Sequence, residues 1–268
     1  MAGNSGSSGR PVAARALAML DAFTAEAPRL TLSEIAERSG TPLTTAHRLV
    51  GSLADWGALV RRSDGRYEIG RKLWDLGLLA AVQLELRQVA APFLLDVHTA
   101  TRDTVHLAVR DGLSALYVER ISGRESVPVV SQVGSRLPLH ATGVGKVLLA
   151  HAPPEVVDAA LSRLTRVTRA TVAVPGRLRR DLEEVRRRGY ARTAEEMSLG
   201  TSSVAVPVRG ADGTVAAALG IVVPTAARRD LTRLVAPLQV AAAGCARRLG
   251  ADGSASVERK PGWTAGSR

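Results

Sequence analysis

Residues 31–42 carry two helix starts separated by one glycine, an arrangement that few folds can use. Thr31 and Glu34 have the spacing of a capping box, in which the two residues satisfy each other's backbone N–H groups at the first turn of a helix. Gly40 suits the end of that helix, and Thr41-Pro42 offers a cap and a first-turn proline for the next one. Two short helices joined by a tight glycine turn are typical of a helix-turn-helix.

A β-hairpin signal follows the second predicted helix. Leu59–Arg62 and Arg66–Ile69 are short strand-like segments on either side of Asp64-Gly65, a turn dipeptide that strongly favours a hairpin. A hairpin in this place is the wing of a winged helix. With a further helix over Pro11–Phe23, residues 11–70 predict a winged helix-turn-helix domain. The helix that begins at Thr41-Pro42, the second of the helix-turn-helix motif, is the one expected to enter the major groove of DNA.

The predicted helices separate apolar from polar residues. The stripe expected to face the core consists of Val12, Leu17, Leu20 and Phe23 on the first helix and Ala46, Leu49, Val50 and Leu53 on the last. Threonine hydroxyls reach phosphates or bases, and an arginine fork matches guanine or a phosphate, although a plain solvated helix face is the alternative. We expect DNA contacts from Thr44, Thr45, His47, Arg48 and Ser52 on the helix and from Arg61, Arg62 and Arg66 on the wing.

The overall charge does not by itself indicate a nucleic-acid partner. The net charge is +11, but the first 70 residues hold eight arginines against seven carboxylates, so the surplus lies outside the predicted DNA-binding domain. The single cysteine, Cys245, excludes a disulfide framework and a thiolate-rich metal site within one chain. No uncharged apolar run reaches about 18 residues, and residues 1–10 lack the apolar core of a secretion signal. We therefore expect a disordered leader over 1–10, a cytoplasmic location and no membrane partner.

The rest of the chain predicts a linker, a mixed domain and a tail. Residues 71–86 form an apolar helical segment that suits a linker helix packed against a second copy. Residues 87–250 alternate helices with strands, as in an α/β or α+β sensor domain, and 251–268 resemble a disordered polar tail. Strands are expected at 104–109, 115–120, 127–133, 204–208 and 215–222. The fold class predicted for the whole chain is α+β.

From about residue 12 to 249 the sequence resembles the IclR-type transcriptional regulators. The segments that carry this resemblance are Arg15–Leu20, Leu32–Gly40, Thr45–Leu49, Arg66–Gly70, Leu137–Ala150, Arg187–Tyr190 and Val204–Val208. The resemblance implies a winged-helix domain, a GAF-like effector domain, and homodimers or homotetramers on palindromic operator DNA. Leu43 departs from the basic residue that the family often has there, which puts the operator sequence in question.

The turn Gly143–Lys146 opens a helix and has two possible roles. A phosphate-binding loop requires a glycine at the position of His140 and Ser or Thr at that of Val147, so a nucleotide triphosphatase is excluded. The free backbone N–H groups of such a turn suit a small carboxylate, although a tight turn used only for packing is the alternative. The resemblance places Gly143 and Val144 in an effector pocket, where Val129 is a candidate wall.

Four further pocket positions follow from the resemblance. Family members that bind small oxo-acids have more polar residues there, whereas this chain has a threonine, a serine, a glycine and a valine. The pocket is therefore expected to be less polar, and roomier at its glycine, so that it suits an aromatic or branched acid or a lactone-like metabolite. These positions are Thr193, Ser203, Gly220 and Val222.

Catalysis has little support in the sequence. The five histidines lack a His-Glu-x-x-His spacing, no nucleophile elbow is present, and neither a metal site nor a cofactor is expected. Glu195-Glu196 is the one candidate acid–base pair, but a solvated or arginine-paired role is favoured because adjacent residues point apart. The resulting hypothesis is a ligand-responsive regulator, and a repressor rather than an activator. The alternative is a metabolite-processing enzyme with a helical dimerisation domain.

Overall fold

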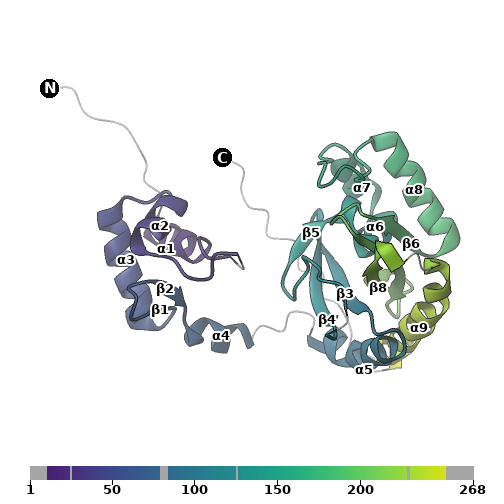
Figure 1. Cartoon of the computed structure of the whole chain (residues 1–268), viewed down its shortest axis with the longest axis horizontal. Coiled ribbons are helices and arrows are strands. Elements are labelled where there is room, and N and C mark those ends of the chain that lie inside the picture. Colours follow the sequence, from purple (N-terminus) through teal and green to yellow (C-terminus); the bar gives the residue numbers. More distant parts are fainter. Residues whose placement is uncertain (1–10, 25, 79–83, 125, 228–229, 252–268) are drawn as a thin grey trace. The chain divides into compact units, whose positions relative to one another are not determined.

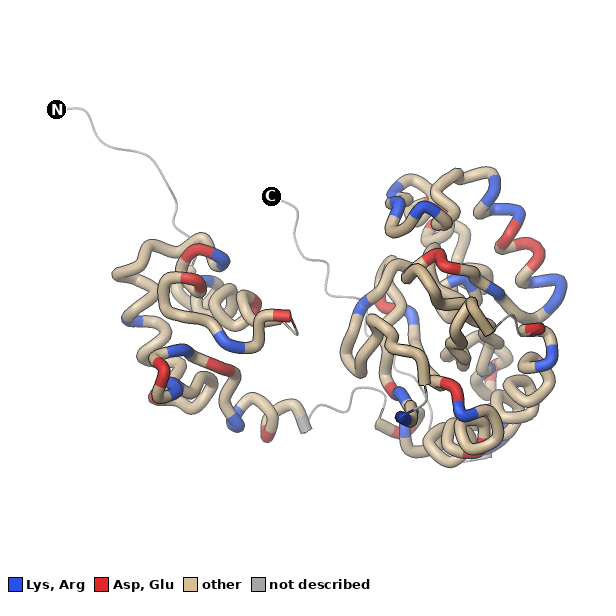
Figure 2. The backbone as a smooth tube through the Cα atoms, viewed as in Figure 1, with Lys and Arg blue, Asp and Glu red and all other residues tan. Residues whose placement is uncertain are grey.

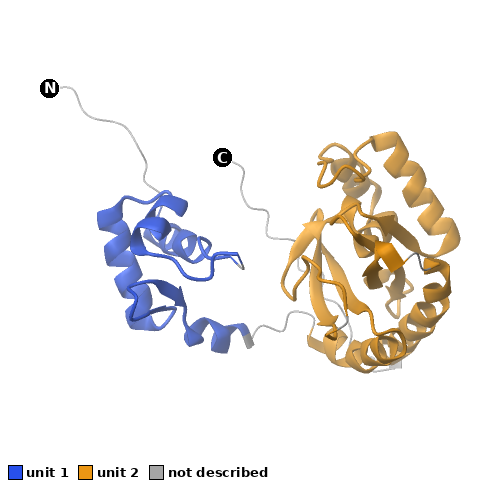
Figure 3. Ribbon diagram, viewed as in Figure 1, with its two compact units in different colours: residues 1–82 blue, residues 83–268 orange. Residues whose placement is uncertain are grey.

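The computed structural model describes residues 11–24, 26–78, 84–124, 126–227 and 230–251, which belong to two compact units divided between residues 82 and 83 (Figure 3). The predicted leader, 1–10, and the predicted tail beyond Ala251 lie outside the described residues. Within them, no helix combines the length and the hydropathy needed to cross a bilayer.

Unit 1 is a winged helix-turn-helix, as the sequence predicts (Figure 1). The capping box of Thr31 and Glu34 forms, and Gly40 takes the left-handed conformation, with φ of 61°, in the turn that follows. Pro42 is the N-cap of the next helix rather than its first residue. The elements are α1 (Val12–Leu20), α2 (Leu32–Arg38), α3 (Leu43–Trp56), β1 (Leu59–Arg61), β2 (Tyr67–Ile69) and α4 (Arg71–Leu78).

The core of unit 1 corrects the predicted stripe of the first helix. Val12 and Leu17 are 50% and 61% exposed, whereas Met19 is fully buried and packs with Ile35 and Val50. Leu17, two residues before Met19, points to the opposite side of α1 and is exposed, whereas Val12 shares the face of Met19 but lies at the exposed first turn of the helix. The apolar face of α3 is confirmed: Ala46, Leu49 and Val50 are buried, and Leu53 packs against the core.

The predicted linker over 71–86 is described only in part. Its first half is α4, which ends at Leu78; residues 79–83 lie outside the described residues, and Leu84–Leu86 form the start of another helix. A linker helix over the whole of 71–86 stays a prediction, because its middle lies outside the described residues.

Unit 2 is an antiparallel six-stranded sheet with helices on both faces (Figure 1). Helices α5 and α9 cover one face, and α6 with α7 and α8 covers the other, so each face has its own apolar core. The strand order is β5-β4-β3-β8-β7-β6. The bounds are α5 (Leu84–Thr101), β3 (Thr104–Asp111), β4 (Ser114–Ile121), β5 (Arg136–Pro138), α6 (Gly143–Ala150), α7 (Pro154–Leu161), α8 (Pro175–Arg188), β6 (Ala191–Ala194), β7 (Thr201–Arg209), β8 (Val215–Pro224) and α9 (Val235–Ala251).

The strand predicted over 127–133 is wrong. The described residues of this segment are irregular, and only Ser131 among them is buried. Pro128 has no backbone N–H for a ladder, and the apolar valines around it lie in a loop. This loop forms part of the cavity described below.

Candidate functional site

Helix α3 exposes the side chains that the sequence predicts for DNA contact. Thr44, His47, Arg48 and Ser52 are exposed and Thr45 is partly buried, because the apolar residues between them pack on α1 and α2. The Ser52 hydroxyl donates to the Arg48 carbonyl at 3.2 Å. Leu43, at the start of the helix, is 51% exposed and offers an apolar contact such as a thymine methyl takes.

The three wing arginines differ in their partners. Arg62 forms an ion pair with Glu68, and Arg66 pairs with Glu34 at 3.1 Å. The amide and hydroxyl of Thr31 lower the pKa of Glu34, so this carboxylate is charged when it meets Arg66. Arg61 instead lies over the ring of Tyr67, 5.8 Å from its centroid, with no carboxylate partner in the described part of the chain. Arg61 is therefore the wing cation most available to a phosphate.

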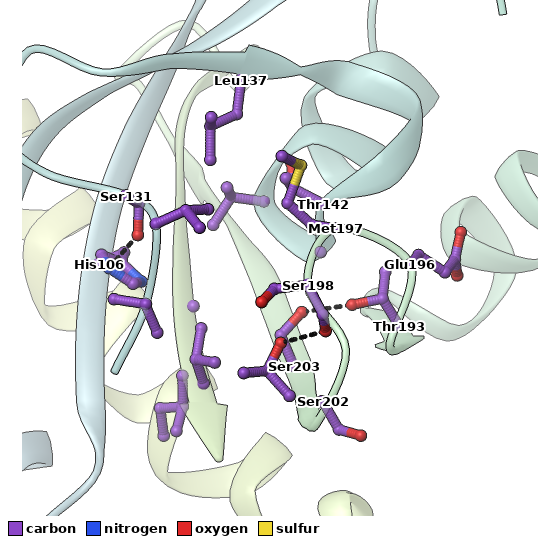
Figure 4. A pocket seen from close by; sticks show the side chains of 18 of the residues that line it. His106, Ser131, Leu137, Thr142, Thr193, Glu196, Met197, Ser198, Ser202 and Ser203 are labelled. Atoms are coloured by element: carbon purple, nitrogen blue, oxygen red, sulfur yellow. Dashed lines mark hydrogen bonds between the residues drawn. The ribbon is translucent and has the colours of Figure 1, made fainter. Parts of the chain in front are cut away.

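Unit 2 holds a cavity of about 50 Å³ between α6, the sheet and the loop that contains Ser131 (Figure 4). Its wall includes all seven residues that the sequence predicts for an effector, although they come from five separate stretches of chain. Its further lining residues are His106, Tyr117, Val130, Ser131, Leu137, Thr142, Glu196, Met197, Ser198, Thr201, Ser202, Val204 and Ile221. Among these described residues there is no lysine or arginine, so a negative charge on a ligand must be met by dipoles.

The N-terminus of α6 supplies those dipoles. Thr142 caps the helix by accepting a hydrogen bond from the Gly145 N–H at 3.1 Å, which leaves the Gly143 and Val144 N–H groups without an acceptor within the helix. Gly143 lies so close to β7 that a Cβ there would approach the Ser203 hydroxyl to 2.6 Å. Ser203 in turn shares a hydrogen bond of 2.6 Å with Thr193 (Figure 4). Backbone N–H groups and hydroxyls thus meet at one end of the cavity.

The opposite wall carries an uncharged polar group. His106 is 2% exposed, and its ring is hydrogen-bonded to the Ser131 hydroxyl at 2.8 Å. The rings of His106 and Tyr117 pack in a T-shaped arrangement with their centroids 5.0 Å apart. Burial, with a smaller contribution from Arg120, lowers the pKa of His106 to about 3. Burial also raises the pKa of Tyr117 to about 12. Both side chains are neutral at physiological pH and can exchange hydrogen bonds with a neutral hydroxyl.

The expected extra room at Gly220 is absent. A Cβ at this glycine would lie 2.8 Å from Cγ1 of Val144 and 3.3 Å from the Ala205 Cβ, so neighbouring side chains already occupy the space. The glycine allows α6 to approach β8 closely, and a larger ligand must find its volume elsewhere in the cavity.

A buried ion pair beside the cavity was not predicted from the sequence. Nζ of Lys146 bonds Glu196 at 2.7 Å and Asp181 at 3.2 Å, and the side chains of Lys146 and Glu196 are only 3% and 8% exposed. The expectation of a solvated or arginine-paired Glu196 is therefore wrong. The signal was available in the sequence: Lys146 is the one charge in an otherwise apolar helix, where a lysine has to find a carboxylate.

Among the described residues, no cluster of histidine, cysteine or carboxylate side chains has the make-up of a metal site. Glu195 and Glu196 do not act together either. Glu195 accepts from the Gly200 N–H at 3.0 Å, in a loop where its own φ is 58°, while Glu196 points to Lys146.

Comparisons with known proteins agree on one family. Residues 12–63 match the IclR helix-turn-helix domain, and residues 79–247 match the bacterial transcriptional regulator IclR C-terminal domain. The HTH-type transcriptional regulator XynR of Escherichia coli (strain K12) is 34% identical over 241 residues, which are 88% of this chain and 96% of that protein. The transcriptional repressor IclR of the same strain is 29% identical, over 71% of this chain and 72% of its own.

Solved structures give the same result. An IclR homolog from Microbacterium hydrocarbonoxydans, crystallised as a complex with 4-hydroxybenzoate, superposes with a TM-score of 0.84 and 37% identity, over 90% of this chain and 100% of that one. The relatives are named as transcriptional regulators rather than enzymes, which excludes the alternative of a metabolite-processing enzyme.

Proposed function

Since this chain belongs to the IclR family of bacterial transcriptional regulators, we propose that it is a repressor whose affinity for operator DNA is controlled by a small organic acid. DNA binding and transcription regulation come with the family. Repression is supported by the name of the Escherichia coli relative, and the cytoplasm is the proposed location, where the chromosome lies.

For DNA, we propose that two copies of α3 enter successive major grooves of a palindromic operator, as a homodimer or homotetramer. Thr44, Thr45, His47, Arg48 and Ser52 face the bases and phosphates in this arrangement, and Arg61, Arg62 and Arg66 face the backbone. The exposure of the helix residues supports this assignment, and so does the absence of a carboxylate partner for Arg48 in the described part of the chain.

For the effector, the main supporting observation is that the seven residues expected to bind it all line one cavity. These are Val129, Gly143, Val144, Thr193, Ser203, Gly220 and Val222. The N–H groups of α6 and the hydroxyls of Thr193 and Ser203 suit a carboxylate, and the apolar walls suit a ring or a branched chain. The 4-hydroxybenzoate of the Microbacterium homolog has this chemistry, and its hydroxyl would match neutral His106 at the far wall.

The size of the cavity adds a condition. Pockets for drug-sized ligands typically measure about 300–1,000 Å³, whereas this cavity measures about 50 Å³. Binding therefore requires the wall to move, which gives an effector different affinities for two conformations. Such a difference, typically about 1–3 kcal/mol, is what couples a ligand to DNA affinity.

Two measurements test the proposal. For DNA, the full chain should shift a duplex from its own upstream region at low ionic strength. Arg48→Ala should weaken this binding, while Arg110→Ala, an exposed arginine of unit 2, should not. Retention of full affinity by Arg48→Ala would contradict the assignment of α3.

For the effector, thermal unfolding is followed with 4-hydroxybenzoate, benzoate and branched-chain acids. A ligand at 100 times its Kd adds about 2.7 kcal/mol to stability, and it should also change DNA affinity. Ser203→Ala should remove the response, while Ser162→Ala, an exposed serine of the same unit, should keep it. If no acid stabilises the chain, effector control by this class of ligand is wrong.

A further inference from the structure

A second concavity in unit 2 is lined in part by Glu196, which also lines the cavity of Figure 4. It measures about 420 Å³ and lies between the connection from α7 to α8, the start of α8 and the end of β6. The connection from α7 to α8 is held against the residues that follow β6. Thr168 donates a hydrogen bond to the Glu195 carbonyl at 2.6 Å, and Thr171 donates one to the Glu196 carbonyl at 2.7 Å. We name this concavity the arginine pocket, after Arg166, Arg169 and Arg177 in its wall.

The arginine pocket carries uncompensated positive charge. None of its three arginines has an ion-pair partner among the described residues, whereas Arg179 and Arg187, further along α8, pair with carboxylates. Figure 2 shows the basic positions along α8 and the chain that leads into it. Arg166 donates to the Arg169 carbonyl at 3.1 Å, which holds its guanidinium beside the loop.

The one acid in the wall does not neutralise these arginines. Glu196 already accepts from Lys146 at 2.7 Å and from the Val172 N–H at 3.4 Å. Helix α8 adds further positive potential, since its N-cap, Val174, lines the pocket and has no side chain that could satisfy the first N–H groups.

We propose that the arginine pocket binds a small oxyanion with more than one negative charge, a phosphate ester or a polycarboxylate, as a second ligand of the regulator. Guanidinium forks bond both groups in pairs of hydrogen bonds. The other wall residues are alanines, valines and Thr171, with no aromatic ring to stack on a base, so the anionic group itself is the feature recognised. The site is separate from the proposed effector cavity and shares only Glu196 with it.

The test measures binding of inorganic phosphate, pyrophosphate and citrate to the full chain by calorimetry at about physiological ionic strength, where delocalised attraction is screened. At least one of the three should bind saturably, one per chain. The double variant Arg169→Gln/Arg177→Gln should lower that affinity at least about tenfold, the effect of losing charged hydrogen bonds. Tighter binding of phosphate or pyrophosphate than of citrate would indicate a phosphate ester as the ligand, and tighter binding of citrate would indicate a polycarboxylate.

The matched control is Arg163→Gln/Arg180→Gln, which removes the same charge from two exposed arginines outside the pocket. It should bind like the parent chain. Non-saturable binding, or an equal loss in both double variants, overturns the proposal and assigns the attraction to the net charge of the chain. DNA binding measured in parallel is expected to stay intact in both variants, so a failure of the second site is distinguishable from a failure of the regulator assignment.

Discussion

The exposed site on α3 and the wing and the cavity of unit 2 differ in how their charged groups are solvated and paired. In unit 1 the polar groups of α3 and the wing lie in water, and Arg48 and Arg61 have no carboxylate partner in the described part of the chain. In unit 2 the cavity is lined by neutral groups, and its one carboxylate, Glu196, is buried against Lys146. Residues of the exposed site on α3 and the wing can be substituted with little effect on folding, whereas the residues around the cavity belong to the core on which the stability of unit 2 depends.

The largest effect should come from breaking the buried pair. Lys146→Met leaves Glu196 without its cation, and an unpaired buried charge costs about 3–5 kcal/mol of stability. Hydrogen exchange of α6 in the full chain measures this loss directly. Lys146→Met/Glu196→Leu should recover much of it.

The control for this experiment is an exposed pair in the same unit. Arg179 and Asp158 have side chains that are 55% and 66% exposed, so Arg179→Met should cost less than about 1 kcal/mol. Equal losses in the two single variants would show that burial does not distinguish the pairs.

A smaller effect concerns pH. The pKa of His106 falls from an ordinary value of 6.5 to about 3 in the folded chain, so the unfolded chain takes up a proton first as the solution becomes acidic. Stability is therefore fully present above pH 6.5 and is lost as the pH falls toward 3. The expected loss between pH 7 and pH 5 is about 2 kcal/mol.

Denaturant unfolding at several pH values checks this loss. His106→Gln should flatten the dependence, while His47→Gln, on the exposed face of α3, should leave it unchanged. A full slope in His106→Gln would mean that another group carries the dependence.

The smallest effect distinguishes two neighbours on the wing. Each phosphate contact steepens the dependence of log affinity on log salt concentration by about 0.9. Arg61→Gln should remove close to this amount, because Arg61 has no carboxylate partner among the described residues, while Arg62→Gln should remove less, since Glu68 already compensates Arg62. DNA titrations over a series of salt concentrations measure both slopes. A larger change in Arg62→Gln would reverse this ranking.

The sequence predicted the local features well because their causes are local. The capping box of Thr31 and Glu34 and the apolar face of α3 depend on residues within one or two turns of each other. The strand predicted at 127–133 failed for the opposite reason: its valines have strand propensity, but Pro128 and the lack of a partner strand leave them in a loop. Leu17 was misplaced because more than one apolar face fits α1 and only packing selects one, and Val12 was misplaced because the first turn of the helix extends beyond the core.

By itself, the sequence determined the winged helix-turn-helix and the mixed domain, since turns, caps and periodicity act between near neighbours, and its resemblance to the IclR family indicated the positions where an effector is expected. Only the tertiary structure decided that seven of those positions line one cavity, that Val144 fills the space at Gly220, and that Lys146 meets a carboxylate 50 residues away. These outcomes depend on the distance between α6 and the sheet. That distance is determined by the close packing of side chains from segments that are far apart in the sequence.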